Sequence, residues 1–101
     1  MNFQIINNQG VFELHGQLVN EYSEEAFECL NTLLDTYYEI VICLKSLTKI
    51  DESGLALMHF VSEKAKKRSK TLFVLGIQNK RILKKFKSAN LKSIFKSEYY
   101  H

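Results

Sequence analysis

The sequence has no proline and no tryptophan, and it has only two cysteines and four glycines in 101 residues. The lack of proline argues against a proline-rich linker, and the length favours one small domain over residues 1–101. No run of about 20 apolar residues occurs, so we expect no membrane span. The first residues lack the basic and apolar segments of a signal peptide. A content of 46% apolar residues excludes a disordered chain.

The few cysteines and histidines exclude several kinds of site. Cys29 and Cys43 form neither a Cys-x-x-Cys motif nor a disulfide framework. Both lie in apolar segments, which predicts two small core residues in a reducing, cytoplasmic compartment. His15, His59 and His101 lack the spacing of metal ligands, and no glycine-rich phosphate-binding motif occurs. We therefore expect no metal, no cofactor and no catalytic site.

The charge is distributed unevenly along the chain, although the net charge is only +3. Residues 1–63 carry ten acidic and two basic side chains, whereas residues 64–101 carry twelve basic side chains and one acidic one. A basic half of this kind is typical of proteins that bind nucleic acid or anionic membranes, and also of helices with lysine-rich solvated faces.

The hydrophobic pattern predicts alternating strands and helices. Two β-prone runs, 3–6 and 11–15, flank a turn-forming Asn-Asn-Gln-Gly segment and predict a hairpin. From residue 22 to 37 apolar residues recur at helical spacing, with Asn20 or Ser23 as candidate caps.

The second half of the chain predicts a βαβ unit. Apolar runs at 40–44 and 71–75 are typical of buried parallel strands, and the segment between them predicts a helix over 55–67. A third helix is expected after Asn79, and a final edge strand within 91–101. The predicted fold is an α/β sandwich in which about three helices cover a small mixed sheet, in the order ββαβαβα(β).

The crossover loop 45–55 is the best candidate for a functional site, because ligands and partners of α/β proteins meet the carboxyl ends of strands. Leu47 and Ile50 are expected to anchor this loop in the core. The exposed start of the helix then consists of the segment Asp51-Glu52-Ser53-Gly54. Here Gly54 is expected to let another surface approach the backbone closely.

Ser53 has two interpretations at this stage. Serine is a favoured N-cap residue, so capping alone explains its position. Alternatively, Ser53 is a switch hydroxyl. A phosphate would add about −1.5 to −2 charges to the helix start, where free N–H groups stabilise it. The acidic side chains of Asp51 and Glu52 would add to the repulsion of an acidic partner.

The segment IVICLKSLTKIDESGLALMHF, residues 40–60, resembles the signature of STAS domains. The order of elements fits the same family over residues 3–95 and implies a STAS-like sandwich. The resemblance to anti-sigma factor antagonists implies phosphorylation of Ser53 by a GHKL-type serine kinase that is also the anti-sigma factor. The unphosphorylated protein would bind that partner and free sigma. The residues expected to contact the partner are Asn20, Thr48, Asp51, Glu52, Ser53 and Gly54.

A second branch of the family also fits the sequence. The turn that reads Gly-Glu-Leu-Asp in antagonists is Gly16-Gln17-Leu18-Val19 here, and Glu52 replaces a usual serine or threonine. The chain ends soon after Phe95, as in the small STAS subunits of phospholipid-transport ABC complexes. In that alternative, Ser53 contacts an ATPase and the basic third helix meets its acidic face.

Two further functions are disfavoured by the sequence. His59 follows Ser53 by six residues on the same predicted helix, so the two side chains point in different directions and form no catalytic pair. The basic pairs Lys80-Arg81 and Lys84-Lys85 could bind nucleic acid, but Phe86 lies on the apolar face of its helix and cannot stack on bases. We expect neither an enzyme nor a specific nucleic-acid-binding protein.

Overall fold

The computed structural model describes residues 2–95 and contains a five-stranded sheet. The order of strands across the sheet is β1-β2-β3-β5, and β4 pairs with the end of β2. β1 is antiparallel to β2, whereas the other pairings are parallel. The strands are β1 (Phe3–Asn8), β2 (Val11–Leu18), β3 (Glu39–Cys43), β4 (Leu47–Ile50) and β5 (Thr71–Leu75).

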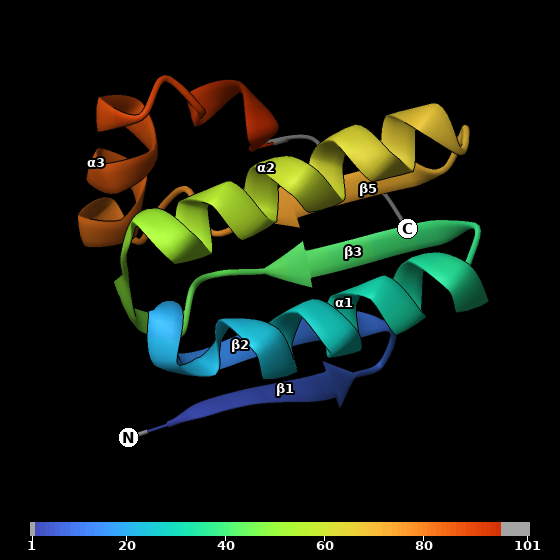
Figure 1. Cartoon of the computed structure of the whole chain (residues 1–101), viewed down its shortest axis with the longest axis horizontal. Coiled ribbons are helices and arrows are strands. Elements are labelled where there is room, and N and C mark those ends of the chain that lie inside the picture. The colour runs from blue at the N-terminus through green and yellow to red at the C-terminus, as the bar shows by residue number, and fades with distance from the viewer. Residues whose placement is uncertain (1, 96–101) are drawn as a thin grey trace.

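Three α-helices accompany the sheet, which confirms the predicted α/β class. α1 and α2 lie side by side over one face of the sheet, and α3 packs beside β4 at one end (Figure 1). No helix within the described range 2–95 is long and apolar enough to span a membrane. The helices are α1 (Ser23–Thr36), α2 (Glu52–Lys67) and α3 (Lys80–Ser88), with short 3-10 helices η1 (Asn20–Tyr22) and η2 (Lys92–Ile94).

The predicted hairpin is confirmed, with strands longer than expected. Only Gln9 and Gly10 form the turn, and both have positive φ, 53° and 92°. Such a turn matches the right-handed twist of the two strands. In β2 the alternate residues Phe12, Leu14 and Leu18 are buried under the helices, as a half-covered strand requires.

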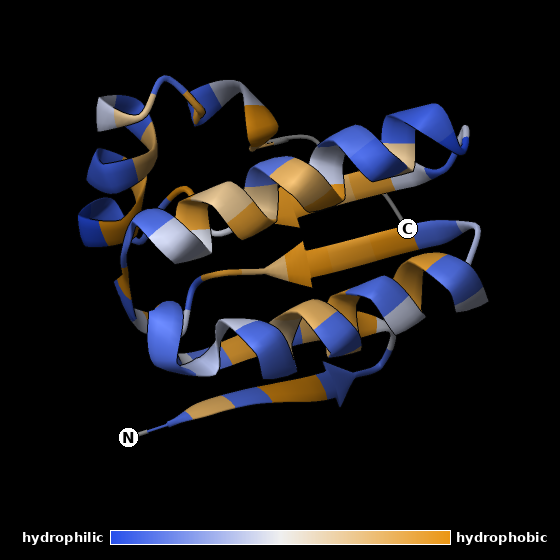
Figure 2. Cartoon of the chain, in the orientation of Figure 1, coloured by the Kyte–Doolittle hydropathy of each residue, from blue (hydrophilic) through white to orange (hydrophobic). Residues whose placement is uncertain are grey.

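The core lies between the sheet and the helices (Figure 2). The predicted anchors Leu47 and Ile50 belong to it and are almost fully buried. They hold the crossover segment in place at the edge of the sheet where α2 begins. The other largest buried side chains are Phe86, Leu14, Leu18, Leu30, Leu34, Ile40, Ile42, Leu44, Met58 and Ile82.

The crossover is not a loop throughout, because it contains the unpredicted strand β4. β2 extends beyond the end of β3, and its last residues, Gly16 to Leu18, are free to pair with β4 through a bulge. β4 has only four residues, and so short a segment does not show the alternating pattern of a strand in the sequence. Their pairing depends on a partner strand about thirty residues earlier, which local patterns do not report.

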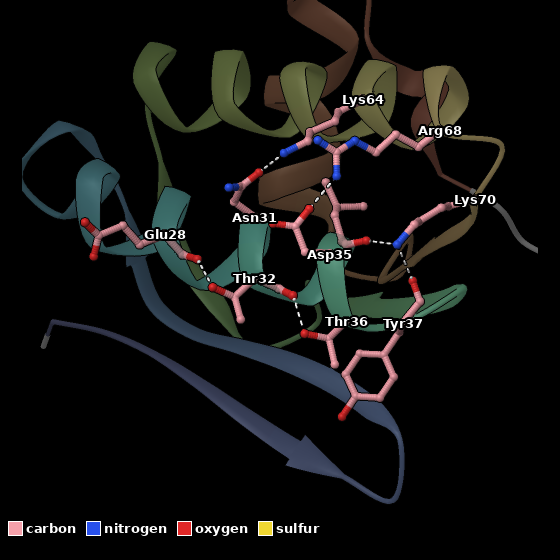
Figure 3. A network of polar contacts seen from close by, with 10 residues as sticks. Glu28, Asn31, Thr32, Asp35, Thr36, Tyr37, Lys64, Arg68 and Lys70 are labelled. Atoms are coloured by element: carbon pink, nitrogen blue, oxygen red, sulfur yellow. Dashed lines mark hydrogen bonds and ion pairs between the residues drawn. The ribbon is translucent and has the colours of Figure 1, made fainter.

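Basic residues tie the second half of α2 to α1 (Figure 3). Lys64 donates to the side chain of Asn31, and Arg68 forms an ion pair with Asp35. Lys70, which follows α2, donates to the carbonyl oxygens of Leu34 and Tyr37. Carbonyls at a helix end lack intrahelical partners, so Lys70 also caps α1.

The prediction that both cysteines are core residues is wrong. Cys29 is exposed on α1, and Cys43 is half-buried. The reason is that Cys29 lies beside the buried stripe of Ala26, Leu30 and Leu34 rather than in it. Burial and the neighbouring acidic side chains raise the pKa of the Cys29 thiol, which disfavours the reactive thiolate.

The predicted C-terminal edge strand is not formed by the described part of that segment. Residues Lys92–Ile94 form η2, and Phe95 packs edge-on against Phe86 with ring centroids 4.9 Å apart. Aromatic packing onto α3 therefore replaces strand pairing at this point. Residues 96–101 lie outside the described residues.

Candidate partner-binding site

Asp51 caps α2 and joins it to the start of α1. One carboxylate oxygen accepts the N–H of Gly54 at 3.0 Å, and the other accepts the N–H of Asn20 in η1 at 2.9 Å. The prediction that Ser53 lies at or near the N-cap is refined, because Ser53 is the second residue of the helix. Aspartate is as good a cap as serine, and only Asp51 has the extended backbone of a cap.

The contacts of Asp51 favour the ionised form of its carboxyl group. Partial burial acts to raise its pKa, but the backbone hydrogen bonds from Asn20, Gly54 and Ser53 outweigh it. The pKa is therefore lower than the usual value. A negative charge at this position also interacts favourably with the N-terminus of α2.

Ser53 is half-buried, and its hydroxyl donates to the side-chain oxygen of Asn20 at 3.1 Å. The structure thus brings together three of the predicted site residues, Asn20, Asp51 and Ser53, although they come from two distant segments. Two hydrogen bonds between the start of α2 and η1 fix the position of the Ser53 hydroxyl. Glu52, between Asp51 and Ser53, is exposed.

Gly54 packs against the interior of the fold and is not available to a partner. It is buried, and a Cβ atom there would lie 2.1 Å from the carbonyl oxygen of Leu18 and 2.7 Å from Cγ1 of Ile50. The close approach predicted for Gly54 is real, but the approaching surface is the end of β2. Gly54 is therefore a packing residue that lets α2 start against the sheet.

Thr48 also has a contact inside the fold. Its hydroxyl donates to the carbonyl oxygen of Gly16 at 2.9 Å and so links β4 to β2. A partner could still touch Thr48, because its side chain is exposed. The hydrogen bond to β2, however, is a sufficient structural reason for a threonine at position 48.

An aromatic groove beside Ser53 was missed by the sequence analysis. Phe27 of α1 and Phe60 of α2 are 37% and 46% exposed, and their ring centroids lie 5.5 Å apart. Helical periodicity assigns both to the apolar faces of their helices, yet both side chains remain partly exposed. The groove has a volume of about 420 Å³ and is lined by Ser23, Glu24, Phe27, Ser53, Ala56, Leu57 and Phe60.

One acidic side chain, Glu24, lines this groove, and two more lie close to its lining residues in the sequence. Glu21 and Glu24 lie in the first turns of η1 and α1, and Glu52 lies in the first turn of α2. No group of metal-ligating side chains occurs among the residues the structure describes. The site thus combines a hydroxyl, two partly exposed aromatic rings and the acidic side chain of Glu24.

Comparisons with known proteins agree with this fold. A model of the STAS domain family matches residues 1–100. The anti-sigma factor antagonist SpoIIAA in its unphosphorylated form has 15% identity and a TM-score of 0.56, over 72% of this chain and 71% of that one. The Bacillus cell fate determinant SpoIIAA in the phosphorylated form has 16% identity and a TM-score of 0.68, over 97% and 92%. No curated protein sequence matches.

Proposed function

The chain belongs to the STAS domain family, and from this premise we propose that it is a non-catalytic anti-sigma factor antagonist, switched by phosphorylation of Ser53. The observation that carries the proposal is the position of the Ser53 hydroxyl, at the start of α2 and on the wall of an exposed aromatic groove. The antagonist whose structures resemble this one is known in both phosphorylated and unphosphorylated forms.

In the unphosphorylated state, the groove provides the apolar part of the binding surface. An apolar side chain of the partner would pack against Phe27 and Phe60, whose rings are partly exposed on the wall of the groove. Aromatic side chains at the centre of an interface contribute much of its affinity.

Phosphorylation would change this surface without unfolding the domain. The partner kinase would transfer the terminal phosphoryl group of ATP to Ser53 Oγ, so that an O–P bond replaces the O–H bond and ADP leaves. The hydrogen bond to Asn20 would be lost, because the hydroxyl is its donor. About −1.5 to −2 charges would be added beside Glu24 and Glu52, and the partner would be released.

The alternative, a STAS subunit that binds the ATPase of a phospholipid-transport ABC complex, is favoured by one observation. The Ser53 hydroxyl is half-buried and already engaged with Asn20, as expected of a residue that is a fixed part of a contact surface. In this alternative the groove is the same, but Ser53 is never modified.

The two functions are separated by capturing the partner from extract of the source cells. The tagged protein should retain a GHKL-type kinase, and incubation of the pair with ATP should place one phosphate on Ser53, located by mass spectrometry. Ser53→Glu should abolish capture, whereas Ser88→Glu, the same change at an exposed serine of α3, should not.

Capture of an ABC ATPase instead, without modification of Ser53, would establish the alternative. Capture of the kinase with equal efficiency by the wild type and by Ser53→Glu would contradict the switch itself. Phe60→Ser tests the groove separately, because it should weaken capture of either partner while leaving Ser53 intact.

A further inference from the structure

The charge of the second half of the chain divides into two groups in the structure. Residues 64–95 contain eleven basic side chains and no acidic one. Four of the five cations between residues 64 and 70 have contacts inside the chain, because Lys64, Arg68 and Lys70 bind α1 (Figure 3) and Lys66 pairs with Glu63. The contacts of Lys64, Arg68 and Lys70 stabilise the α1–α2 pair, whereas Lys67 and Lys92 are single exposed cations outside α3.

The second group lies on α3 and has no such role. Its five cations are all exposed, and none forms an ion pair or a side-chain hydrogen bond within residues 2–95. The opposite face of α3 is buried through Ile82 and Phe86. The outward face therefore presents only charge, and its cations are Lys80, Arg81, Lys84, Lys85 and Lys87.

Two of these cations oppose the formation of α3, although Lys85 and Lys87 lie in the last turn, where the helix dipole favours positive charge. Lys80 and Arg81 lie in the first turn, where the helix dipole disfavours positive charge, and no acidic residue accompanies them. Like charges also lie four residues apart, Lys80 with Lys84 and Arg81 with Lys85, and repel each other. Folding stability does not explain the cations of the first turn, and their charge fits an anionic partner.

The chemistry of the surface indicates which anion it fits. The core of a protein interface is apolar and depleted in lysine, unlike this face. Binding of single-stranded nucleic acid needs exposed aromatic rings, and the one exposed large apolar side chain near α3 in the described chain is Ile77, 42% exposed. A group of lysines beside an exposed aliphatic side chain is typical of reversible contact with charged lipid.

We propose that the outward face of α3, with Ile77, binds the surface of bilayers that contain anionic phospholipids. The cations attract the head groups, and Ile77 reaches the boundary of the acyl chains. α1 and α3 lie on opposite sides of α2 (Figure 1). An anionic bilayer therefore attracts α3 and repels the acidic α1, which orients the molecule and leaves α1 turned toward a partner.

Sedimentation with vesicles tests this proposal independently of any protein partner. At about 0.1 M salt the protein should bind vesicles of phosphatidylcholine with phosphatidylserine but not vesicles of phosphatidylcholine alone. The double variant Lys80→Glu/Arg81→Glu should weaken binding at least about tenfold and remain folded, because acidic residues suit the first turn of a helix.

Two controls make the result specific. Lys66→Glu/Lys67→Glu makes the same change of charge at the end of α2 and should weaken vesicle binding less than Lys80→Glu/Arg81→Glu does. Ile77→Ser should reduce binding a few-fold without changing the net charge. The proposal is overturned if the wild type ignores phosphatidylserine, if both double variants bind equally, or if duplex DNA at equal phosphate concentration displaces the protein from vesicles.

Discussion

The starts of α2 and α3 use the same capping device and present opposite surfaces. Asp51 caps α2 and also accepts an N–H from η1, while Asn79 caps α3 and also donates to the carbonyl oxygens of Leu44, Lys45 and Leu47. The first turn of α2 is acidic and that of α3 is basic. The two helix starts are held in the fold in the same way but carry opposite charges. We infer that the exposed residues of each first turn reflect the partner that each helix binds, rather than the needs of folding.

The buried face of α3 should stabilise the fold, whereas its exposed face should not. This contrast between the two faces has the largest expected effect on the free energy of unfolding. Phe86 is fully buried, so Phe86→Ala should lower the free energy of unfolding by about 3–5 kcal/mol. Lys85→Ala, one residue away on the outer face, should change it by less than about 0.5 kcal/mol. Denaturant unfolding measures both, and equal effects would show that the two faces of α3 do not differ in this way.

Gly54 tests the packing of α2 against β2. Replacing an exposed glycine in a helix with alanine stabilises it by up to about 1 kcal/mol. At Gly54 we expect the opposite sign, a loss of about 1–3 kcal/mol, because the added Cβ meets the carbonyl oxygen of Leu18. A rise in the unfolding midpoint of Gly54→Ala would contradict the close approach of α2 to the sheet.

The two caps should differ in their response to pH. Asp51→Ala and Asn79→Ala should each cost about 1–2 kcal/mol at neutral pH. Since the pKa of Asp51 is lower in the folded chain than its ordinary value of 3.8, its ionic contribution is complete above that value and is lost as pH falls through the folded pKa. Unfolding curves measured from pH 7 to about pH 2 should therefore show a shrinking cost for Asp51→Ala only. A parallel decrease for Asn79→Ala would point to a general acid effect instead.

The first turn of α3 should give the smallest effect, and one of unusual sign. Lys80→Glu/Arg81→Glu should raise the free energy of unfolding by up to about 1 kcal/mol, because each acidic residue interacts favourably with the helix dipole. Thermal melts at low salt, where the effect is least screened, are the suitable measurement. A clear loss of stability would mean that these cations have a structural role after all.

Most of the fold could be predicted because it is encoded in local periodicity. The buried runs of β3 and β5, the turn at Gly10 and the cap at Asn79 depend on residues close to one another in the sequence. β4 could not be found this way, since it forms only against the free end of β2.

Within the segment predicted as the candidate site, the structure arranges the residues differently from the expectation. The segment from Asp51 to Gly54 was identified, yet Gly54 packs inward, and Asp51 rather than Ser53 is the cap. The aromatic groove was missed because helical periodicity separates an apolar face from a polar one but cannot tell which residue at the margin a neighbouring helix covers. Phe27 and Phe60 are such residues, since both belong to apolar helix faces and both remain partly exposed.

The most direct test of the account compares the affinity of one captured partner for three forms of the protein. Ser53→Glu and Phe60→Ser alter the start of α2 and its groove, whereas Lys80→Glu/Arg81→Glu alters only α3. In a calorimetric titration we predict loss of binding for the first two and an affinity close to that of the wild type for the third. Full affinity in Ser53→Glu and Phe60→Ser, with loss in the α3 variant, would contradict the assignment of partner recognition to the start of α2.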